Sequence, residues 1–308
     1  MPDPTNKPRI VVGLGELLWD LLPSGKQLGG APANFAYISS LFGARAVVAS
    51  RVGVDPLADD AVQTLATLGL EDALVQRDSS HPTGTVGIEI DDHGQPTFTI
   101  FEDVAWDHIE WTPDWEKLAA QADAVCFGSL AQRSPDSRST ILRFLKSTRN
   151  DALRIFDVNL RQNYFSRGVL IESLTLADVV KLNDAELPVL LSTCGLPVRN
   201  ELENARVLRQ EFDLDLVCVT RGMHGSLLLS ESESDAHPGY KVTVSDTIGA
   251  GDAFTATLAH LYAQEASLPS INTVANRVGS WVASLPGAMP RISREEFQRQ
   301  FILPGGVG

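Results

Sequence analysis

Cysteine and positive charge are both scarce in this 308-residue chain. Its three cysteines, Cys126, Cys194 and Cys218, are far apart and odd in number, which argues against a disulfide framework or a zinc site and favours a reducing compartment. The 25 Lys and Arg residues face 39 Asp and Glu, and the net charge of -14 disfavours nucleic acid or a membrane surface as partners. Without a signal-like N-terminus or a membrane-spanning apolar run, the sequence predicts a cytoplasmic protein.

What the chain does contain is a regular alternation of short apolar segments with amphipathic ones. Strand-like segments begin at Arg9, Ala46, Asp123, Leu153, Asp178 and Asp215. Helical patterns such as 135–150 and 200–212 lie between them. This order predicts an α/β protein with a mainly parallel sheet covered on both faces, in one domain over residues 1–308.

One segment breaks this alternation. Residues 83–111 alternate with period two and contain a turn signal at 91–96, which is typical of a hairpin. Together with residues 16–30, this segment is expected to form a small separate sheet.

Polar clusters follow the predicted strands at 157–161, 183–186 and 220–222, and a fourth cluster at 249–252 follows a strand-like run at 240–244. Ligands of open α/β sheets bind beyond the carboxyl ends of the strands. The clusters therefore predict a ligand site at that edge.

The cluster at 249–252 begins a helix with three very small residues, Gly249, Ala250 and Gly251, followed by Asp252. The first N–H groups of a helix lack intrahelical partners and lie at the positive end of its dipole. Small residues let a phosphate approach them, so the segment is a candidate anion hole with a catalytic acid beside it. The alternative is a glycine-rich turn in which Asp252 only stabilises the helix.

Two further glycine motifs precede helix-like or strand-like segments. The GxG at 13–15 lacks the third glycine of a dinucleotide motif, so Glu16 and Asp20 fit better as polar groups facing a sugar. Gly29 and Gly30 lead into a helix with Asn34 in its first turn. This pair fits either a plain loop or close approach to a polyol whose hydroxyls bond Asn34.

The pair Asn183 and Glu186 also has two explanations. Their spacing is that of a capping box, and it equally suits a carboxylate that holds a water of Mg²⁺. Arg161 is expected either to bridge surface acids or to clamp a phosphate.

These motifs together resemble those of the ribokinase-like (PfkB) sugar kinase family, over almost the whole chain. The resemblance is carried by "DTIGAGDAF" at 246–254, "GGAPAN" at 29–34, "FDVNLRQNYF" at 156–165 and "KLNDAEL" at 181–187. It implies a three-layer α/β/α sandwich with a small β-sheet lid, formed by about 16–30 and 83–111, which often serves as a dimer interface.

The resemblance also implies residue roles. Asp252 would be the catalytic base, the amides of 249–251 the anion hole, and Asn183 with Glu186 the Mg²⁺ motif. ATP would be bound by Asn183, Thr220, Gly222, Gly225, Gly249, Gly251 and Asn276. The sugar would meet Glu16, Asp20, Gly29, Gly30, Asn34 and Asp252. A potassium ion would lie by Asp246 and the carbonyl of Ile248.

We therefore expect an ATP-dependent sugar kinase that converts D-fructose to fructose 6-phosphate. The lid segment 101–111 has acids where many relatives carry an arginine, which leaves 2-keto-3-deoxygluconate, ribose or a ribofuranoside as alternative substrates. A non-catalytic sugar-binding protein is the remaining alternative within the family, and the incomplete glycine motif disfavours a nicotinamide oxidoreductase.

Overall fold

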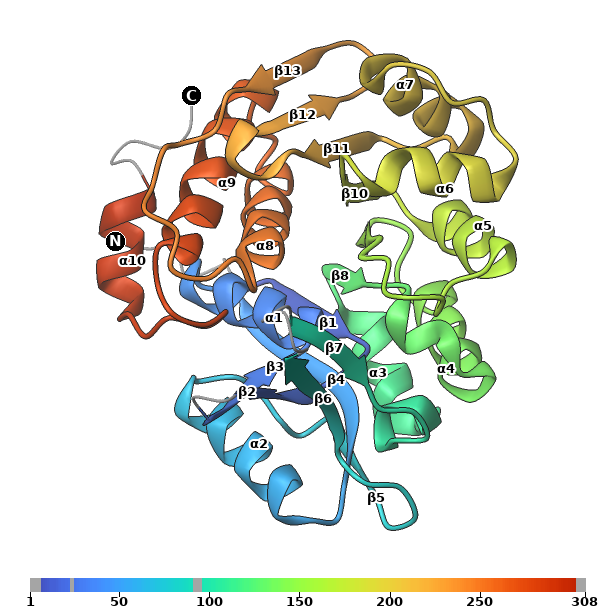
Figure 1. The fold of residues 1–308 in the computed structure, drawn as a ribbon, viewed down its shortest axis with the longest axis vertical. Helices are drawn as coiled ribbons and strands as arrows, with labels where there is room; N and C mark the ends of the chain where they lie inside the picture. The colour runs from blue at the N-terminus through green and yellow to red at the C-terminus, as the bar shows by residue number, and fades with distance from the viewer. Residues whose placement is uncertain (1–6, 23–24, 91–95, 303–308) are drawn as a thin grey trace.

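The computed structural model describes residues 7–22, 25–90 and 96–302 (Figure 1). Its large sheet has the order β13-β12-β11-β10-β9-β8-β1-β4-β5. The parallel strands are β1 Ile10–Leu14, β4 Arg45–Gly53, β5 Val75–Asp78, β8 Ala124–Phe127, β9 Leu153–Asp157, β10 Val179–Asn183 and β11 Leu216–Thr220. The antiparallel edge consists of β12 Ser226–Leu229 and β13 Ser234–His237. The predicted parallel sheet is thus confirmed.

Helices cover both faces of this sheet (Figure 1). One hydrophobic cluster contains residues of α1 Ala31–Leu41, α2 Pro56–Thr67, α8 Ala250–Tyr262, α9 Leu268–Ala283 and α10 Arg294–Phe301. The other contains residues of α3 Pro113–Gln121, α4 Pro135–Lys146, α5 Arg167–Leu176, α6 Glu186–Cys194 and α7 Glu201–Phe212. Short 3₁₀ turns are η1 Ala105–His108, η2 Leu130–Arg133 and η3 Gly222–His224.

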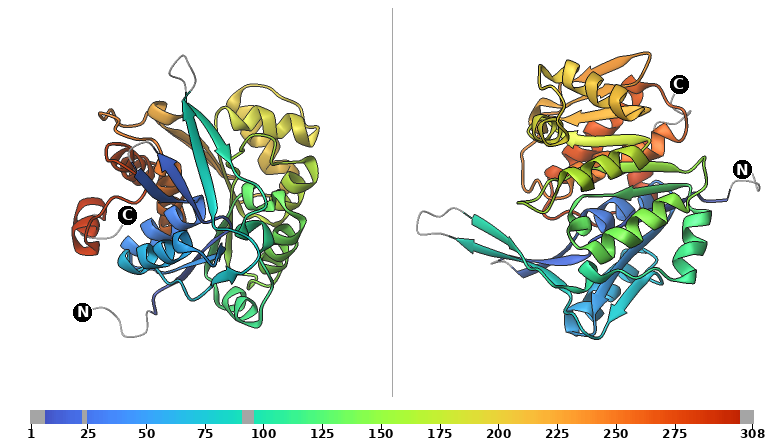
Figure 2. Two further views of the ribbon diagram at one scale, coloured as in Figure 1. Left: turned by 60° about the horizontal axis from the view of Figure 1, so that its bottom comes forward. Right: turned by 90° about the vertical axis from the view of Figure 1, so that its right-hand side faces the viewer.

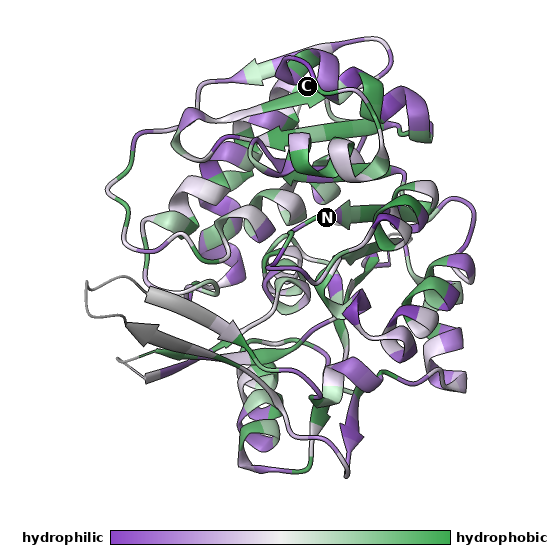
Figure 3. Ribbon diagram, turned by 45° about the vertical axis from the view of Figure 1, so that its right-hand side comes forward, coloured by the Kyte–Doolittle hydropathy of each residue, from purple (hydrophilic) through white to green (hydrophobic). Residues whose placement is uncertain are grey.

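The central strands are apolar on both sides because each side faces a helical layer. On β1, Val11 belongs to the first cluster and Val12 to the second, and on β11 Cys218 and Val219 divide in the same way. Hydrophobic colour accordingly runs along the large-sheet strands, whereas the helices show both colours (Figure 3). This is the burial pattern expected of a parallel sheet.

The small sheet is built from the two segments that the sequence singled out. Its strands are β2 Leu18–Leu22, β3 Gly25–Gly29, β6 Gly84–Ile90 and β7 Pro96–Ile100, in the order β3-β2-β6-β7. The sheet extends away from the body (Figure 2). Val86 and Ile100 face each other across β6 and β7 and are buried in the cluster that also contains Trp106. The predicted turn at 91–96 lies largely outside the described residues.

Two local predictions are wrong. Residues 240–244 form no strand, because Pro238 and the left-handed Gly239 turn the chain away from the edge strand β13, and Val242 and Val244 are exposed. The hairpin also ends at Ile100, because the chain then enters η1, which packs the buried Trp106 into the body.

Candidate active site

Two of the predicted site residues, Asp252 and Asn34, come together where the first turns of α8 and α1 meet. Asp252 lies in the first turn of α8 and is half-buried, and Asn34 lies in the first turn of α1 and is buried. The Asn34 side-chain nitrogen donates a 2.7 Å hydrogen bond to Oδ2 of Asp252. The structure therefore joins the predicted catalytic acid to a predicted sugar ligand.

Tight packing requires small residues at the start of α8, in addition to any need to expose the backbone there. Gly249 has a left-handed φ of 78°, and a Cβ there would lie 2.4 Å from Cβ of Ala288. A Cβ on Gly251 would lie 2.8 Å from Nζ of Lys181. The helix start can therefore hold an anion and also lets a lysine approach from within the protein.

Lys181 is a functional candidate that sequence reasoning missed. Its Nζ lies 3.1 and 3.2 Å from the two carboxylate oxygens of Asp157, and Thr255 Oγ1 donates to the same carboxylate at 2.8 Å. Burial opposes its charge, but Asp157 and Asp252 raise the pKa of Lys181, so it remains an ammonium. The available signal was a single lysine in a buried apolar strand, since buried lysines are almost always paired.

Three acidic side chains of the candidate site, Asp252, Glu16 and Asp20, have raised pKa values. Burial, reinforced by the charge of Asp157, raises the pKa of Asp252 to about 6, against the effect of Lys181. Burial likewise raises the pKa of Glu16 to about 7 and that of Asp20 to about 6. Such crowding of carboxylates is typical of functional sites.

Two buried oxygen atoms of the site are unsatisfied acceptors. Oε2 of Glu16 and Oδ1 of Asn34 have no hydrogen-bond partner among the described residues. A buried acceptor without a partner costs free energy, and a donor such as a sugar hydroxyl would relieve that cost.

The paired glycines before α1 have a structural explanation. Gly30 has a φ of 109°, and a Cβ there would lie 2.5 Å from the carbonyl oxygen of Glu16. A Cβ on Gly29 would lie 2.5 Å from Oδ2 of Asp20. Close approach to the lid therefore accounts for both glycines, and their contact with a sugar stays a prediction.

Arg161 is exposed, and its Nη1 donates to the carbonyl of Leu160 at 3.1 Å. Its positive charge lowers the pKa values of Asp252, Glu16 and Asp20, although burial outweighs it at each acid. Arg161 is therefore the cation that acts on all three acids from the solvent side.

Asn183 and Glu186 form a reciprocal capping pair at the carboxyl end of β10. The Glu186 amide donates to Oδ1 of Asn183 at 2.8 Å, and the Asn183 amide donates to Oε2 of Glu186 at 2.9 Å. Oε1 of Glu186 accepts a further N–H from Leu160 at 2.8 Å. The capping explanation is thus confirmed, and a role in holding Mg²⁺ through water stays a prediction.

The predicted nucleotide stretch follows β11. Thr220 ends that strand, Gly222 and Gly225 have positive φ values of 55° and 82°, and a Cβ on Gly225 would lie 1.9 Å from the His237 carbonyl. Asn276 on α9 is buried, and its amide donates to Ser226 Oγ at 2.7 Å. The glycines therefore serve the backbone path, and contact of this stretch with ATP stays a prediction.

Asp246 stabilises the loop before α8 through hydrogen bonds to two backbone N–H groups. Its Oδ1 accepts the N–H of Ile248 at 2.9 Å, and its Oδ2 accepts that of Gly287 at 3.3 Å. The carboxylate and the Ile248 carbonyl therefore belong to one ordered loop, as a monovalent-cation site there would need.

The lid carries an arginine contact that the lid sequence alone does not reveal. Arg133 of η2 forms two 2.8 Å hydrogen bonds with Asp107, and its Nη2 donates to the Phe101 carbonyl at 2.6 Å. Its guanidinium also lies 4.0 Å from the ring centre of Trp106. A residue from outside segment 101–111 therefore supplies an arginine beside Phe101.

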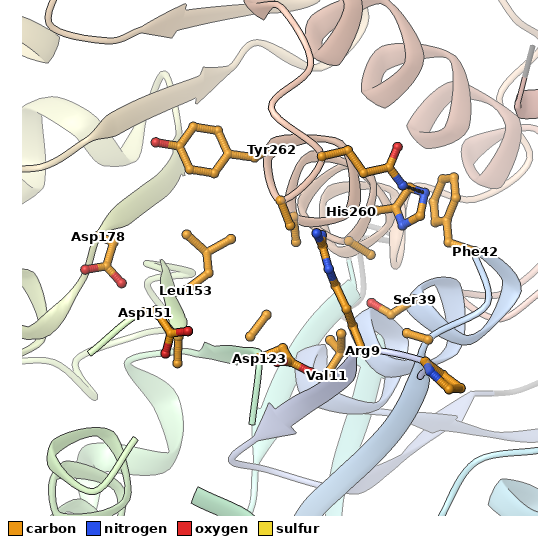
Figure 4. Close-up of a pocket in the computed structure, with 18 of the residues that line it drawn as sticks. Arg9, Val11, Ser39, Phe42, Asp123, Asp151, Leu153, Asp178, His260 and Tyr262 are labelled. Atoms are coloured by element: carbon orange, nitrogen blue, oxygen red, sulfur yellow. Dashed lines mark hydrogen bonds between the residues drawn. The ribbon is translucent and has the colours of Figure 1, made fainter. Parts of the chain in front are cut away.

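A hollow of about 1070 Å³ lies elsewhere, at the amino ends of the large-sheet strands (Figure 4). Charged side chains of both signs line it, including Arg9, Asp123, Arg149 and Asp178. Ligands of open α/β sheets bind at the opposite, carboxyl ends of the strands, so this hollow is not the candidate active site.

Within the described ranges, no helix combines the length and apolarity needed to cross a bilayer. Cys126, Cys194 and Cys218 are buried free thiols.

Known proteins provide an independent comparison. Residues 24–294 match the model for pfkB family carbohydrate kinases. A fructokinase of Klebsiella pneumoniae is 31% identical over 93% of this chain and 97% of its own length.

Solved structures of sugar kinases have the same fold as this chain. An uncharacterized sugar kinase from Pyrococcus horikoshii in complex with ATP has a TM-score of 0.79 at 28% identity, and the match covers 96% of this chain and 100% of that one. Fructokinase from Vibrio cholerae O395, bound to fructose, ADP and a calcium ion, has a TM-score of 0.77 at 25% identity, with coverages of 96% and 99%. These likenesses confirm the ribokinase-like α/β fold with its small additional sheet.

Proposed function

The chain belongs to the pfkB family of carbohydrate kinases, and we propose that it transfers the γ-phosphoryl group of ATP to the 6-hydroxyl of D-fructose. The observation that carries this proposal is Asp252, held by Asn34 at the half-buried start of α8. A proton acceptor and the positive amino end of a helix stand side by side there, and in-line phosphoryl transfer uses both.

In the proposed reaction Asp252 aligns the sugar hydroxyl and takes its proton as the bond to phosphorus forms. The amides of 249–251 stabilise the charge on the phosphoryl oxygens, and Arg161 adds positive charge from the solvent side. The ammonium of Lys181, beneath Gly251, adds to the field at this helix start. The products are ADP and the sugar phosphate, with the hydroxyl proton on Asp252.

The donors present also fit the expected cations. Each oxygen of Glu186 already accepts a backbone N–H, so the carboxylate suits a water-mediated contact with Mg²⁺ better than direct coordination. Asn183 would lie beside it. Asp246 and the Ile248 carbonyl are oxygen donors in one loop and would hold K⁺. These ions would neutralise phosphate charge when bound.

The polar residues on the lid side of the site favour a neutral sugar as the substrate. Glu16, Asp20, Gly29, Gly30 and Asn34 would face its hydroxyls. A sugar acid such as 2-keto-3-deoxygluconate would place its carboxylate among three carboxylates, whereas Arg133 is already paired with Asp107. The relatives named fructokinase favour fructose among neutral sugars.

ATP would lie along the stretch that follows β11 and reach the start of α8. The set comprises Asn183, Thr220, Gly222, Gly225, Gly249, Gly251 and Asn276. Glycine-containing turns at 222 and 225 support this placement because they leave backbone free of side chains.

The whole chain would act as one cytoplasmic kinase domain whose lid, formed by about 16–30 and 83–111, closes over the sugar and pairs with a second copy. Exposed Leu21 and Phe101 support the dimer, because apolar lid surface gains from being covered. Light scattering on the protein alone tests the dimer, and a monomer at micromolar concentration overturns it.

The function is tested by ADP release with ATP and Mg²⁺ over a panel containing D-fructose, ribose, 2-keto-3-deoxygluconate and a ribofuranoside. We expect the highest kcat/KM for D-fructose and a 6-phosphate product by NMR. A clearly higher value for another substrate overturns the choice of fructose. Sugar binding without ADP release for any substrate overturns the kinase activity and indicates a non-catalytic sugar-binding protein.

A further inference from the structure

A second cluster of ligating side chains lies at the base of the lid, outside the residues assigned to sugar, ATP or Mg²⁺. His81 precedes β6, Asp103 follows β7, and His108 ends η1. One ligand atom from each lies within 4.8 Å of the other two. We propose that His81, Asp103 and His108 bind a divalent transition-metal ion, with Zn²⁺ as the reference ion.

The hydrogen bonds of His81 determine which nitrogen is free. Its Nδ1 lies 3.0 Å from Oδ2 of the buried Asp78, which also accepts from Arg51 Nε at 3.0 Å. The other oxygen of Asp78, Oδ1, accepts the backbone N–H groups of Ser80 and His81 at 2.8 and 3.1 Å, so this carboxyl group accepts on both oxygens. An ionised carboxylate cannot donate, so the hydrogen lies on Nδ1 and the lone pair of a neutral His81 on Nε2.

His108 also has a carboxylate near each ring nitrogen. Its Nδ1 lies 3.4 Å from Oδ2 of Asp136, and its Nε2 lies 3.1 Å from Oδ1 of Asp103. The same Asp103 oxygen lies 3.6 Å from Nε2 of His81. Each imidazole thus has a carboxylate behind it and Asp103 in front of it.

The Asp103 carboxylate faces the Nε2 atoms of both imidazoles, and one metal ion can bind all three atoms at once. A proton on one imidazole satisfies a single contact, whereas a metal ion satisfies all three. Two imidazoles and one carboxylate, with carboxylates behind the imidazoles, form a donor set typical of Zn²⁺ and related ions. Mg²⁺ is a poor occupant because it prefers oxygen ligands.

The burial of the cluster suits entry of an ion. The side chains of His81 and His108 are 26% and 27% exposed, and that of Asp103 is 81% exposed. The two imidazole rings stack at 3.6 Å between centroids with 12° between their planes. Their lone pairs therefore run side by side, and binding requires the partly exposed rings to tilt toward one point.

An ion at this place would connect the two ends of the lid hairpin. His81 lies on the chain entering β6, and Asp103 lies on the chain leaving β7. Metal binding is therefore expected to increase hydrogen-exchange protection at the base of the hairpin, in residues 81–87 and 99–108.

The test is isothermal titration of Zn²⁺ into the chelator-treated full chain without ATP or sugar. We expect one saturable site, and we expect Asp103→Asn and His108→Ala each to weaken it at least about tenfold, the lower limit seen when even an outer partner of a metal ligand is lost. His224→Ala is the matched control, because His224 is an exposed histidine outside the cluster, and it should leave the affinity unchanged.

No saturable binding by the wild-type protein overturns the proposal. Equal affinity in wild type, Asp103→Asn and His108→Ala also overturns it, since the ion would then bind elsewhere. If His108→Ala does not fold, Asp103→Asn alone decides, because its side chain is mostly exposed and its replacement keeps the shape.

Discussion

Asn34 and Asp252, 218 residues apart in the chain, meet in a 2.7 Å hydrogen bond from the amide nitrogen to the carboxylate. The bond joins the first turns of α1 and α8, and therefore connects the lid side of the site to the anion hole. The remaining oxygen of the Asn34 amide is buried without a partner. One asparagine can thus orient the acid and accept a hydrogen bond from the substrate.

The first prediction is that Asp252→Asn lowers kcat by at least about 10², the lower end of general-base contributions. The variant keeps the size of the side chain and loses the proton acceptor, while the amides of 249–251 remain to bind phosphate. Steady-state ADP release and the melting temperature should be measured on one preparation.

A purely structural acid would behave differently. Loss of a favourable charge in the first turn of α8 would cost up to about 1 kcal/mol of stability and leave turnover nearly intact. A folded Asp252→Asn protein with near wild-type kcat would therefore refute the catalytic role.

The second prediction concerns pH. Activity requires ionised Asp252, so kcat/KM should rise with pH through the pKa of that group, which burial raises to about 6. The hydrogen bond from Asn34 lowers this pKa, so Asn34→Ala should move the rising limb to higher pH. Ser40→Ala, which removes another α1 hydrogen bond without touching Asp252, is the control. An unmoved limb in Asn34→Ala would show that another group controls the profile.

The third prediction is that the buried carboxyl group of Glu16 lowers the stability of the folded protein at neutral and higher pH. Burial raises the pKa of Glu16 from 4.5 to about 7, so the folded state binds this proton more tightly than the unfolded state. The free energy of unfolding should then fall as pH rises from about 4.5 to about 7, by about 3 kcal/mol from this group. Glu16→Gln removes that loss, and it should be more stable than wild type at pH 8 but similar at pH 4.

Urea unfolding at the two pH values measures this difference. Glu116→Gln, at an exposed glutamate on α3, provides the control and should change stability little at either pH. The pKa argument fails if Glu16→Gln changes stability equally at pH 4 and pH 8. A raised KM for the sugar in the same variant would support the binding role.

The fold was largely predictable because its strands are buried on both faces. Apolar runs such as those at β10 and β11 stand out in the sequence, and Asn200 marks the start of α7, where it accepts the Glu203 amide. The strand predicted at 240–244 failed for a related reason. Alternation shows that a segment suits a sheet, but it does not show that the preceding turn at Pro238 and Gly239 directs the segment away from the open edge at β13.

The supporting residues of the site were harder to predict because their partners are distant. The sequence shows a lysine in an apolar strand but not that Asp157 meets it from the neighbouring strand. Similarly, Arg133 reaches the Phe101 carbonyl across 32 residues. Motifs located the reacting groups because the chemistry fixes their local spacing. The groups behind them depend only on tertiary packing.

The fourth prediction separates the two roles of Glu186. Glu186→Gln keeps one carbonyl oxygen but replaces the other with an NH₂ that cannot accept an N–H, so some stability should be lost. If the carboxylate also holds a Mg²⁺ water, the Mg²⁺ concentration for half-maximal rate should rise while the sugar KM changes little. Asn200→Ala is the control, because it removes a different helix cap at a cost of about 1 kcal/mol.

The comparison with Asn200→Ala decides between capping and metal binding. Equal losses of stability with an unmoved Mg²⁺ titration in both variants would leave Glu186 as a helix cap only.

The fifth prediction concerns Lys181 as a positioning residue beneath the anion hole. Lys181→Met leaves the Asp157 carboxylate buried with Thr255 as its remaining side-chain partner, and it should cost about 3 to 5 kcal/mol of stability. The double variant Lys181→Met with Asp157→Asn removes both charges and should recover much of that loss. Its kcat should nevertheless stay low, because the positive charge beneath Gly251 is gone.

A second ion pair between the same two strands gives the matched control. Arg154 of β9 and Asp178, which directly precedes β10, are also 24 residues apart, with Arg154 Nε 3.0 Å from Oδ2 of Asp178, but they lie at the amino ends of the strands. Arg154→Met with Asp178→Asn should therefore lose a comparable pair without lowering kcat. If the Lys181 double variant regains wild-type kcat together with its stability, the lysine only supports the fold. If kcat stays low in the folded Lys181 double variant alone, its charge acts on the phosphoryl group through the start of α8.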